Sequence, residues 1–249
     1  MTNSQVQNYG RILGNEPNGA RAGARTRIGI MDLKIGTINI TTLNEKEEEV
    51  IEVMEERKLK IIGMSETRYK GQGNKTIHDN YSIYYKGRDE DSRHGVAIML
   101  NEEMSKYVEK VYYVNERIIA LRLKISNIRM GIIQVYAPQQ GRPTAEKDKF
   151  YNDLQETYDD MNCTENTIIM GDLNGHVGTN RDGIENVIGA HSIGDTNEEG
   201  RRVIDFCVRN SLTIMNTCFK HRESHKWTWY RWDDRQKRYK SKTMIDQDR

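Results

Sequence analysis

The chain has 249 residues, with 38 Lys and Arg against 37 Asp and Glu, so its net charge is +1. This balance excludes a polycationic nucleic-acid coat and an acidic solvating tail. No uncharged apolar run approaches the roughly 18 residues of a membrane helix, and the first residues have no apolar stretch typical of a secretory signal. The three cysteines form no CxxC pair, which indicates plain thiols in a reducing compartment, nuclear or cytoplasmic.

The first 31 residues differ in composition from the rest. They are rich in Asn, Gly, Ala and Arg and lack the periodicity of a strand or helix. Four arginines and one glutamate precede residue 28, so we predict a disordered basic arm over 1–31. Such an arm suits nucleic acid, although a solvated leader without function explains it equally well. Residues 32–249 are expected to form one domain.

The domain is predicted to open with a strand–helix–strand unit. Residues 33–40 and 61–66 are apolar runs, and Thr42 with Glu45 has the spacing of a capping box. A charged helix follows, with Val50, Ile51 and Met54 on one face. The order indicates two neighbouring parallel strands joined by a crossover helix.

Further strands and two helices are predicted downstream. The expected strands are short, β-branched or aromatic, and bounded by turn residues: 81–85, 95–100, 117–125, 128–137, 166–172, 211–216, 226–232 and 240–246. Ser126-Asn127 predicts a tight hairpin. Thr144 is expected to cap a helix that buries Phe150, Leu154 and Tyr158, and a second helix is expected over 198–210 with Val203, Ile204 and Cys207 inward. This pattern favours an α/β protein with two packed sheets and helices outside.

Polar residues follow five of these strands. They are Asn39, Glu66, Tyr136, the pair Asp172 and Asn174, and Asp246. Strand ends are where side chains converge in open α/β sheets. Carboxylates, amides and a tyrosine select hard ligands, namely Mg²⁺ or Mn²⁺ and phosphate. Each residue taken singly is also explained as a turn residue, a helix cap or a strand terminator, so the prediction rests on the set.

The order of these motifs resembles a known family. The segments TIN (37–39), SET (65–67), YAP (136–138), GDLN (171–174) and MID (244–246) are similar to the serial motifs of the endonuclease/exonuclease/phosphatase superfamily. NEEGRRVIDFC (197–207) and LTIMNTCF (212–219) resemble the endonuclease domain of non-LTR (LINE-type) retrotransposons. Within that group, the chain looks most like the craniofacial development protein 2 group.

The resemblance implies a DNase I-like fold, a four-layer α/β sandwich of two packed β-sheets flanked by helices. It also implies roles for the predicted site residues. Glu66 would bind the metal, with Asn39 beside it placing the metal or the phosphate. Tyr136 would donate a hydrogen bond to the scissile phosphate. Asp172 would position or deprotonate the attacking water, Asn174 would orient Asp172, and Asp246 would support a catalytic histidine.

The chain departs from the family pattern at its end. The family closes with Ser-Asp-His, and this sequence contains no such motif and stops at Arg249. The resemblance therefore implies a domain incomplete at the C-terminus, with its last strands missing and its activity lowered or lost. We interpret His94, His176, His221 and His225 as exposed loop residues rather than as replacements for the missing imidazole.

A basic, aromatic stretch is the predicted DNA-facing surface. Residues 222–242 hold eight Lys or Arg against three acids, interleaved with tryptophan and tyrosine. We expect Arg231, Lys237 and Arg238 to contact nucleic acid, and Asn197 to touch DNA from the start of its helix. The alternatives are a hairpin with core aromatics on one face, and a plain helix start at Asn197.

Three functions follow from these residues. The first is a Mg²⁺-dependent DNA endonuclease that leaves a 3′ hydroxyl, as the resemblance implies. The second is a catalytically dead remnant that binds nucleic acid or protein. The third keeps the hydrolase chemistry but acts on a phosphoinositide or lipid phosphate, and the retroelement-like segments make it the least favoured. DNA is the expected partner, with no membrane and no small-molecule cofactor, and the sequence leaves the oligomeric state open.

Overall fold

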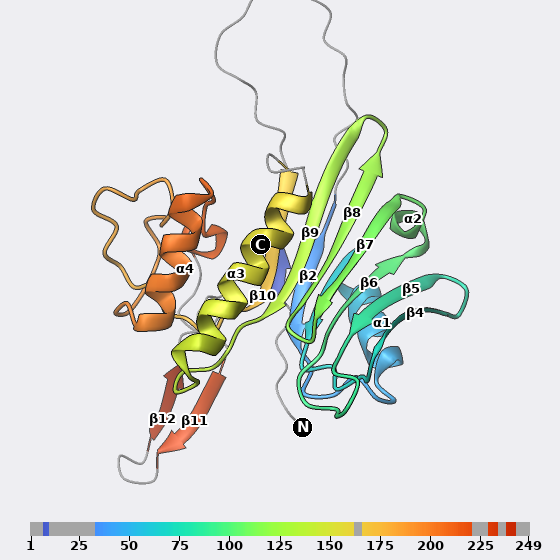
Figure 1. The fold of residues 1–249 in the computed structure, drawn as a ribbon, viewed down its shortest axis with the longest axis horizontal. Helices are drawn as coiled ribbons and strands as arrows, with labels where there is room; N and C mark the ends of the chain where they lie inside the picture. Colours follow the sequence, from blue (N-terminus) through green and yellow to red (C-terminus); the bar gives the residue numbers. More distant parts are fainter. Residues whose placement is uncertain (1–6, 10–32, 162–165, 221–228, 234–237, 243–249) are drawn as a thin grey trace, which may run out of the picture.

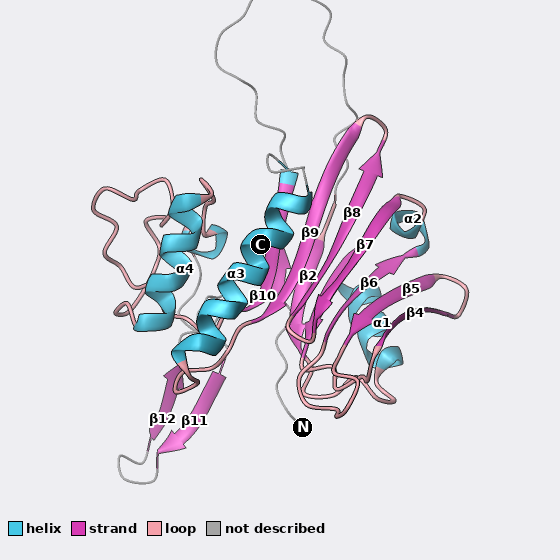
Figure 2. Cartoon of the chain, viewed as in Figure 1, coloured by secondary structure: helices cyan, strands magenta, loops and turns pink. Residues whose placement is uncertain are grey.

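The fold comes from a computed structural model, which describes residues 7–9, 33–161, 166–220, 229–233 and 238–242 (Figure 1). Side chains are described for 33–161 and 166–220. Two β-sheets stand face to face, and helices cover their outer faces (Figure 2). This is the predicted arrangement, and it follows from strands that are apolar on both sides.

The larger sheet is mixed and carries the strand–helix–strand unit. Its strands lie in the order β1-β2-β3-β6-β5-β4. Their bounds are β1 Gln7–Tyr9, β2 Ile35–Asn39, β3 Ile61–Ser65, β6 Val96–Asn101, β5 Tyr81–Lys86 and β4 Gln72–Ile77. Strands β2 and β3 are parallel, with Asn39 opposite Ser65, as the crossover pattern predicts. The polar residues that follow them therefore leave the sheet side by side.

The smaller sheet has the order β10-β9-β8-β7. Its strands are β10 Thr167–Asp172, β9 Ile128–Tyr136, β8 Ile118–Ile125 and β7 Val108–Asn115. The predicted hairpin joins β8 to β9, and Ser126 takes the left-handed conformation there, with φ 55°. Strands β9 and β10 are parallel, which places Tyr136 opposite Asp172. A second set of polar strand ends is thus gathered at one edge.

Apolar side chains fill three layers around these sheets. Ile35, Ile98, Leu121 and Ile132 belong to the core between the sheets and are fully buried. Helix α1, Glu47–Arg57, packs on the outer face of the larger sheet through Val50, Ile51 and Met54, as predicted. Helix α3, Thr144–Met161, covers the smaller sheet (Figure 1) and buries Phe150, Leu154 and Tyr158, again as predicted.

A polar network crosses the otherwise apolar core between the sheets. Gln134 on β9 is fully buried. Its side-chain oxygen accepts a hydrogen bond from Thr37 Oγ1 at 3.1 Å, and its nitrogen donates to Ser65 Oγ at 2.9 Å. Ser65 Oγ in turn donates to the Val135 carbonyl at 3.1 Å. Each of these residues precedes a predicted site residue by one or two positions, so the network fixes how the two sheets face each other at the site.

The remaining elements lie beyond α3 or at the sheet margins. Helix α4, Glu198–Arg209, has its own small core with the loops around it, and Val203 and Cys207 are buried there. Ile204 is partly buried and also packs against this core, and Phe206 is buried in the core under α3. Helix α2 spans Glu102–Ser105, and strands β11, Trp229–Asp233, and β12, Arg238–Lys242, pair with each other. No helix among the described residues is long and apolar enough to cross a membrane.

Three local predictions were wrong. Thr42 and Glu45 form no capping box, because the helix begins only at Glu47 after an N-cap, Lys46, without a side-chain bond. Thr144 is the first residue of α3 rather than its cap. Residues 211–216 form no strand but a single bridge, Ile188 to Ile214, followed by a 3₁₀ turn over Met215–Thr217. The chain folds back there so that Ile214 joins the core of α4.

The ends of the sequence lie mostly outside the description. Gln7–Tyr9 pairs antiparallel with β2, whereas the rest of the predicted basic arm is outside the described residues. The division at residue 31 and the incomplete C-terminus stay predictions.

Candidate nuclease site

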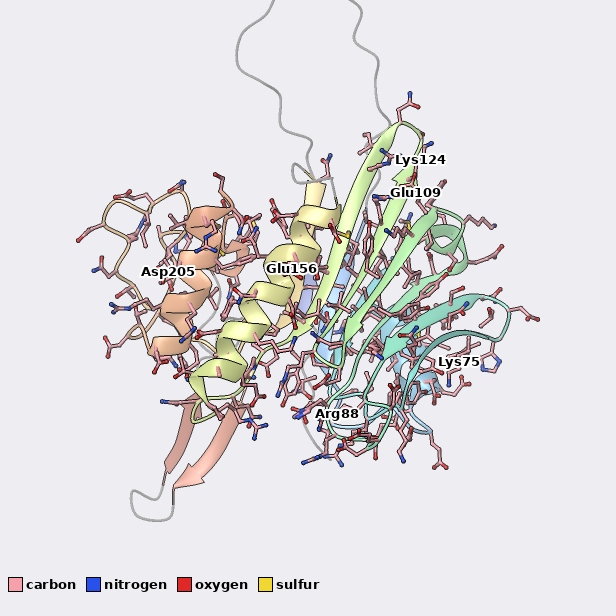
Figure 3. All side chains as sticks on the ribbon, in the orientation of Figure 1. Lys75, Arg88, Glu109, Lys124, Glu156 and Asp205 are labelled. Carbon is pink, nitrogen blue, oxygen red and sulfur yellow. The ribbon has the colours of Figure 1, made fainter. Side chains whose placement is uncertain are left out.

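The carboxyl ends of both parallel strand pairs meet at one end of the sandwich. Glu66 follows β3 and Asn39 ends β2, while Tyr136 and Asp172 end the two neighbouring strands of the other sheet. The loops around Arg88 gather at this end of the molecule, and Lys124 near the β8–β9 hairpin marks the opposite end (Figure 3). The fold therefore brings together four residues that are far apart in sequence.

Hydrogen bonds centre on the Glu66 carboxylate. Asn39 Nδ2 donates to Glu66 Oε1 at 2.7 Å, and its own oxygen accepts from the Thr41 N–H at 3.2 Å. The Tyr136 hydroxyl, from the other sheet, is also hydrogen-bonded to Glu66. Glu66 thus joins the two halves of the site directly.

Tyr136 is held as a protonated donor. Burial raises the pKa of its hydroxyl above the usual range, and the negative charges of Glu66 and Asp172 raise this pKa further. Gln139 Nε2 donates to the hydroxyl oxygen at 3.1 Å. Because the phenol keeps its proton, it can donate a hydrogen bond to an anionic ligand when that ligand replaces Glu66 as the acceptor.

Asp172 and Asn174 are linked through the backbone that follows β10. The Asn174 N–H donates to Asp172 Oδ1 at 3.0 Å, and Asn174 Nδ2 donates to the Ala137 carbonyl at 2.8 Å. Both side chains are buried, at 9% and 6% exposed. Ala137 follows Tyr136, so these bonds tie the Asp172 loop to the end of β9. The Asp172 carboxylate is therefore aimed rather than free to rotate.

Two site residues adopt an uncommon backbone conformation. Glu66 and Asn174 lie in the left-handed region, with φ of 59° and 50°. Asparagine tolerates this region, whereas glutamate seldom occupies it. Such strain costs of order 1–3 kcal/mol and gathers at binding and catalytic sites, where the surrounding structure enforces it. Nine other non-glycine residues of the described part also have positive φ, among them Glu45, so this conformation describes the turn at Glu66 and does not by itself mark a site.

Sequence reasoning missed the residues that pack around Tyr136. Arg117 is only 8% exposed; its guanidinium lies 5.4 Å from the Tyr136 ring centre and donates to the Tyr136 carbonyl at 3.1 Å. It also pairs with Glu146 at 2.8 Å. The one available signal was an arginine opening an apolar strand, which an edge-exposed charge would explain equally well.

His94 is the second residue that sequence reasoning misplaced. Its ring centre lies 5.7 Å from that of Tyr136, so it belongs to the site rather than to an isolated exposed loop. Burial lowers the pKa of the imidazole below 6.5, and the positive charge of Arg117 lowers this pKa further. The ring is consequently neutral near pH 7. The backbone of His94 is also fixed, because its carbonyl accepts a hydrogen bond from the Arg68 N–H at 2.8 Å.

The donor set fits a hard divalent cation held openly. No group of three His, Cys, Asp or Glu side chains gathers among the residues the structure describes. Mg²⁺ does not need such a cage, because it keeps several waters and binds through one or two carboxylates together with substrate phosphates. Glu66 and the Asn39 amide supply donors of that kind.

Several predicted contacts stay untested. Asp246 and Lys237 lie outside the described residues, and the side chains of Arg231 and Arg238 are not described. Asn197 is the N-cap of α4, and its side-chain oxygen accepts from the Gly200 N–H at 2.7 Å. Its predicted contact with DNA stays a prediction.

Comparison with known proteins gives both sequence and fold relatives. No family model matches the chain. It is 34% identical over 196 residues, 78% of its length, to craniofacial development protein 2 from Tragulus javanicus and from Bos taurus. The chain spans about a third of the length of these curated relatives, 34% and 33% respectively.

Solved structures share the fold. The endonuclease domain of TRAS1, a telomere-specific non-LTR retrotransposon, aligns with a TM-score of 0.55 at 11% identity, covering 84% of this chain and 81% of that one. The 3′-5′ exonuclease NExo from Neisseria meningitidis aligns with a TM-score of 0.54 at 17% identity, covering 81% and 79%. These alignments confirm the predicted DNase I-like fold, and the 34% identity confirms the predicted resemblance to the craniofacial development protein 2 group.

Proposed function

We propose that the chain is a metal-dependent DNA endonuclease domain, related to those of non-LTR retrotransposons, which hydrolyses a phosphodiester bond. The observation that carries the proposal is the meeting of Asn39 and Glu66 from one sheet with Tyr136 and Asp172 from the other. A carboxylate for a cation, a protonated phenol and an aimed second carboxylate are the groups that phosphodiester hydrolysis needs.

Each side chain has a separate task in this reaction. The Asp172 carboxylate accepts a proton from water as the water oxygen bonds to phosphorus; the bond from phosphorus to the 3′ oxygen breaks, and that oxygen takes a proton from solvent water to become the 3′ hydroxyl. Tyr136 donates a hydrogen bond to a non-bridging oxygen, where negative charge grows. A bound Mg²⁺ or Mn²⁺ would supply charge neutralisation at the phosphate, with Glu66 and Asn39 as its protein ligands.

The proposed reaction does not need His94 to carry a proton. Its neutral imidazole adjoins Tyr136 and adds a polar group on the same side of the site. Arg117, which is buried and paired with Glu146, keeps positive charge beneath the Tyr136 ring and favours an anionic substrate above it.

The experiment is nicking of supercoiled plasmid by the purified chain in Mg²⁺ and in Mn²⁺. We expect open circles that accumulate with time and disappear on addition of EDTA. Glu66→Gln keeps the size of the side chain but removes the charge, so it should weaken Mn²⁺ binding and slow nicking. A folded wild-type protein that binds Mn²⁺ and leaves the plasmid intact would overturn the proposal and support the alternative of a nucleic-acid-binding remnant.

A further inference from the structure

The loop that carries Asp172 and Asn174 continues into the first turn of α4. There, Asn197 makes three hydrogen bonds to Gly200 and His176. Its side-chain oxygen accepts from the Gly200 N–H at 2.7 Å and from the His176 N–H at 2.9 Å, and its own N–H donates to the His176 carbonyl at 3.1 Å. An ordinary N-cap satisfies only its own helix. Asn197 also binds both backbone polar groups of His176.

The two backbones touch at this point, with no room for side chains between them. A Cβ atom on Gly200 would lie 1.7 Å from the His176 carbonyl oxygen, and one on Gly175 would lie 2.9 Å from the Glu199 carbonyl carbon. Any residue larger than glycine at position 200 would therefore push the loop away from α4. The glycine in the NEEG segment is explained by this close approach.

Helix α4 is itself fixed to α3, so the contact has a rigid base. Lys147 Nζ lies 2.7 Å from Glu199 Oε1, and these two side chains are 7% and 5% exposed. At the other end of the helices, the amides of Gln155 and Asn210 exchange two hydrogen bonds of 2.9 and 2.8 Å. The ion pair is buried and the amide pair is partly buried, so α4 is held against α3 at two points along its length.

A displacement of His176 would also displace Asp172, because few residues separate them. Asn174 is two residues away and donates its N–H to Asp172 Oδ1 at 3.0 Å. Asn174 also anchors the loop to the Ala137 carbonyl at 2.8 Å. The loop is therefore held on one side by the end of β9 and on the other by Asn197.

We propose that Asn197 is a positioning residue, which holds the 172–176 loop so that the Asp172 carboxylate is aimed at the attacking water. This inference rests on the proposed function for its catalytic consequence. The retroelement-like NEEG segment then has a structural role, which is to hold the 172–176 loop in place.

The experiment compares Asn197→Ala with Asn197→Asp and with a matched control, Asn101→Ala. Asn101 is also an N-cap, and it accepts from the Met104 N–H at 3.0 Å at the start of α2. It precedes a helix at the far end of β6, where its hydrogen-bond partners include Lys60, Met104 and Ser105, which lie outside the 172–176 loop. Nicking kinetics and hydrogen exchange of the His176 amide are measured for these three variants and for the wild type.

We expect Asn197→Ala to lower kcat about 10- to 100-fold with little change in KM, because a misplacement near 1 Å costs that much. Exchange at the His176 amide should quicken as its acceptor is lost. Asn197→Asp keeps an acceptor oxygen and should recover most of both quantities. Asn101→Ala should change neither.

Two results would overturn the inference. One is unchanged exchange at His176 in folded Asn197→Ala; the other is a fall in kcat no larger than in Asn101→Ala. If the wild-type chain cuts no DNA, the proposed function fails by itself. Exchange at His176 then still decides whether Asn197 holds the loop.

Discussion

At the scale of single residues, the surroundings of the site change the pKa values of two side chains and the backbone conformation of a third. The Tyr136 phenol is kept protonated by burial and by Glu66, His94 is kept neutral by burial and by Arg117, and Glu66 is held in the left-handed region. Asn39, Glu66, Tyr136, Asp172 and Asn174 could be found from the sequence because each follows a recognisable strand. His94 and Gln139 lie in turns, and only the fold brings them to Tyr136.

Replacing Tyr136 with Phe tests the donor role. The change removes one hydroxyl that bonds to Glu66 and accepts from Gln139. We expect nicking to slow about 10²–10³-fold, the usual loss for one preorganised donor. Tyr81→Phe is the matched control, since its hydroxyl donates to Glu55 at 3.2 Å on the surface. Equal rates for wild type and Tyr136→Phe would remove the phenol from the mechanism.

His94 predicts a specific pH dependence of stability. Its folded pKa lies below 6.5, so the unfolded chain takes up the proton first as the pH falls. The stability that the neutral ring contributes is therefore present above pH 6.5 and lost below it. Urea unfolding of wild type and His94→Gln, from about pH 8 to about pH 5, should give free energies whose difference changes with pH. Two parallel curves would contradict the assignment.

At the scale of elements, the inner strands were predictable, whereas two polar edge strands were not. Strands β4 and β7 were missed; β4 (QGNKTI) is mostly exposed, and β7 is half-exposed at the edge of its sheet. Edge strands need few apolar residues, so their sequences lack the runs that mark inner strands. Residues 211–216 gave the opposite error, because apolar side chains that pack around α4 resemble a strand.

The polar network of Gln134, Thr37 and Ser65 between the sheets could not be predicted, because these residues stand in strands that are otherwise apolar. Gln134→Leu leaves the Thr37 hydroxyl buried without its acceptor, and we expect a loss of about 1–3 kcal/mol in the free energy of unfolding. Adding Thr37→Val removes the orphaned group and should restore much of that loss. Urea denaturation of both proteins measures the effect. Additive losses in the double variant would show that the bond has no such role.

At the scale of the whole molecule, the sandwich places each half of the site on a different sheet. Asn39 and Glu66 depend on β2 and β3, and Tyr136 and Asp172 depend on β9 and β10. The DNase I-like fold could be predicted from five short motifs in order. The approach of the Asn39 and Glu66 half to the Tyr136 and Asp172 half could not be predicted from the sequence. It depends on how the hydrogen bonds among Gln134, Thr37 and Ser65 place one sheet against the other.

The most direct measurement is the nicking rate of the wild type beside those of Asp172→Asn and Asp205→Asn. Asp205 is an exposed aspartate on α4 (Figure 3) and serves as the matched control. We expect Asp172→Asn, folded by circular dichroism, to slow metal-dependent nicking about 10²–10⁴-fold, the range for a lost general base. Asp205→Asn should cut like wild type. Cutting by Asp172→Asn at the wild-type rate would contradict the central claim that this carboxylate and its neighbours form the catalytic site.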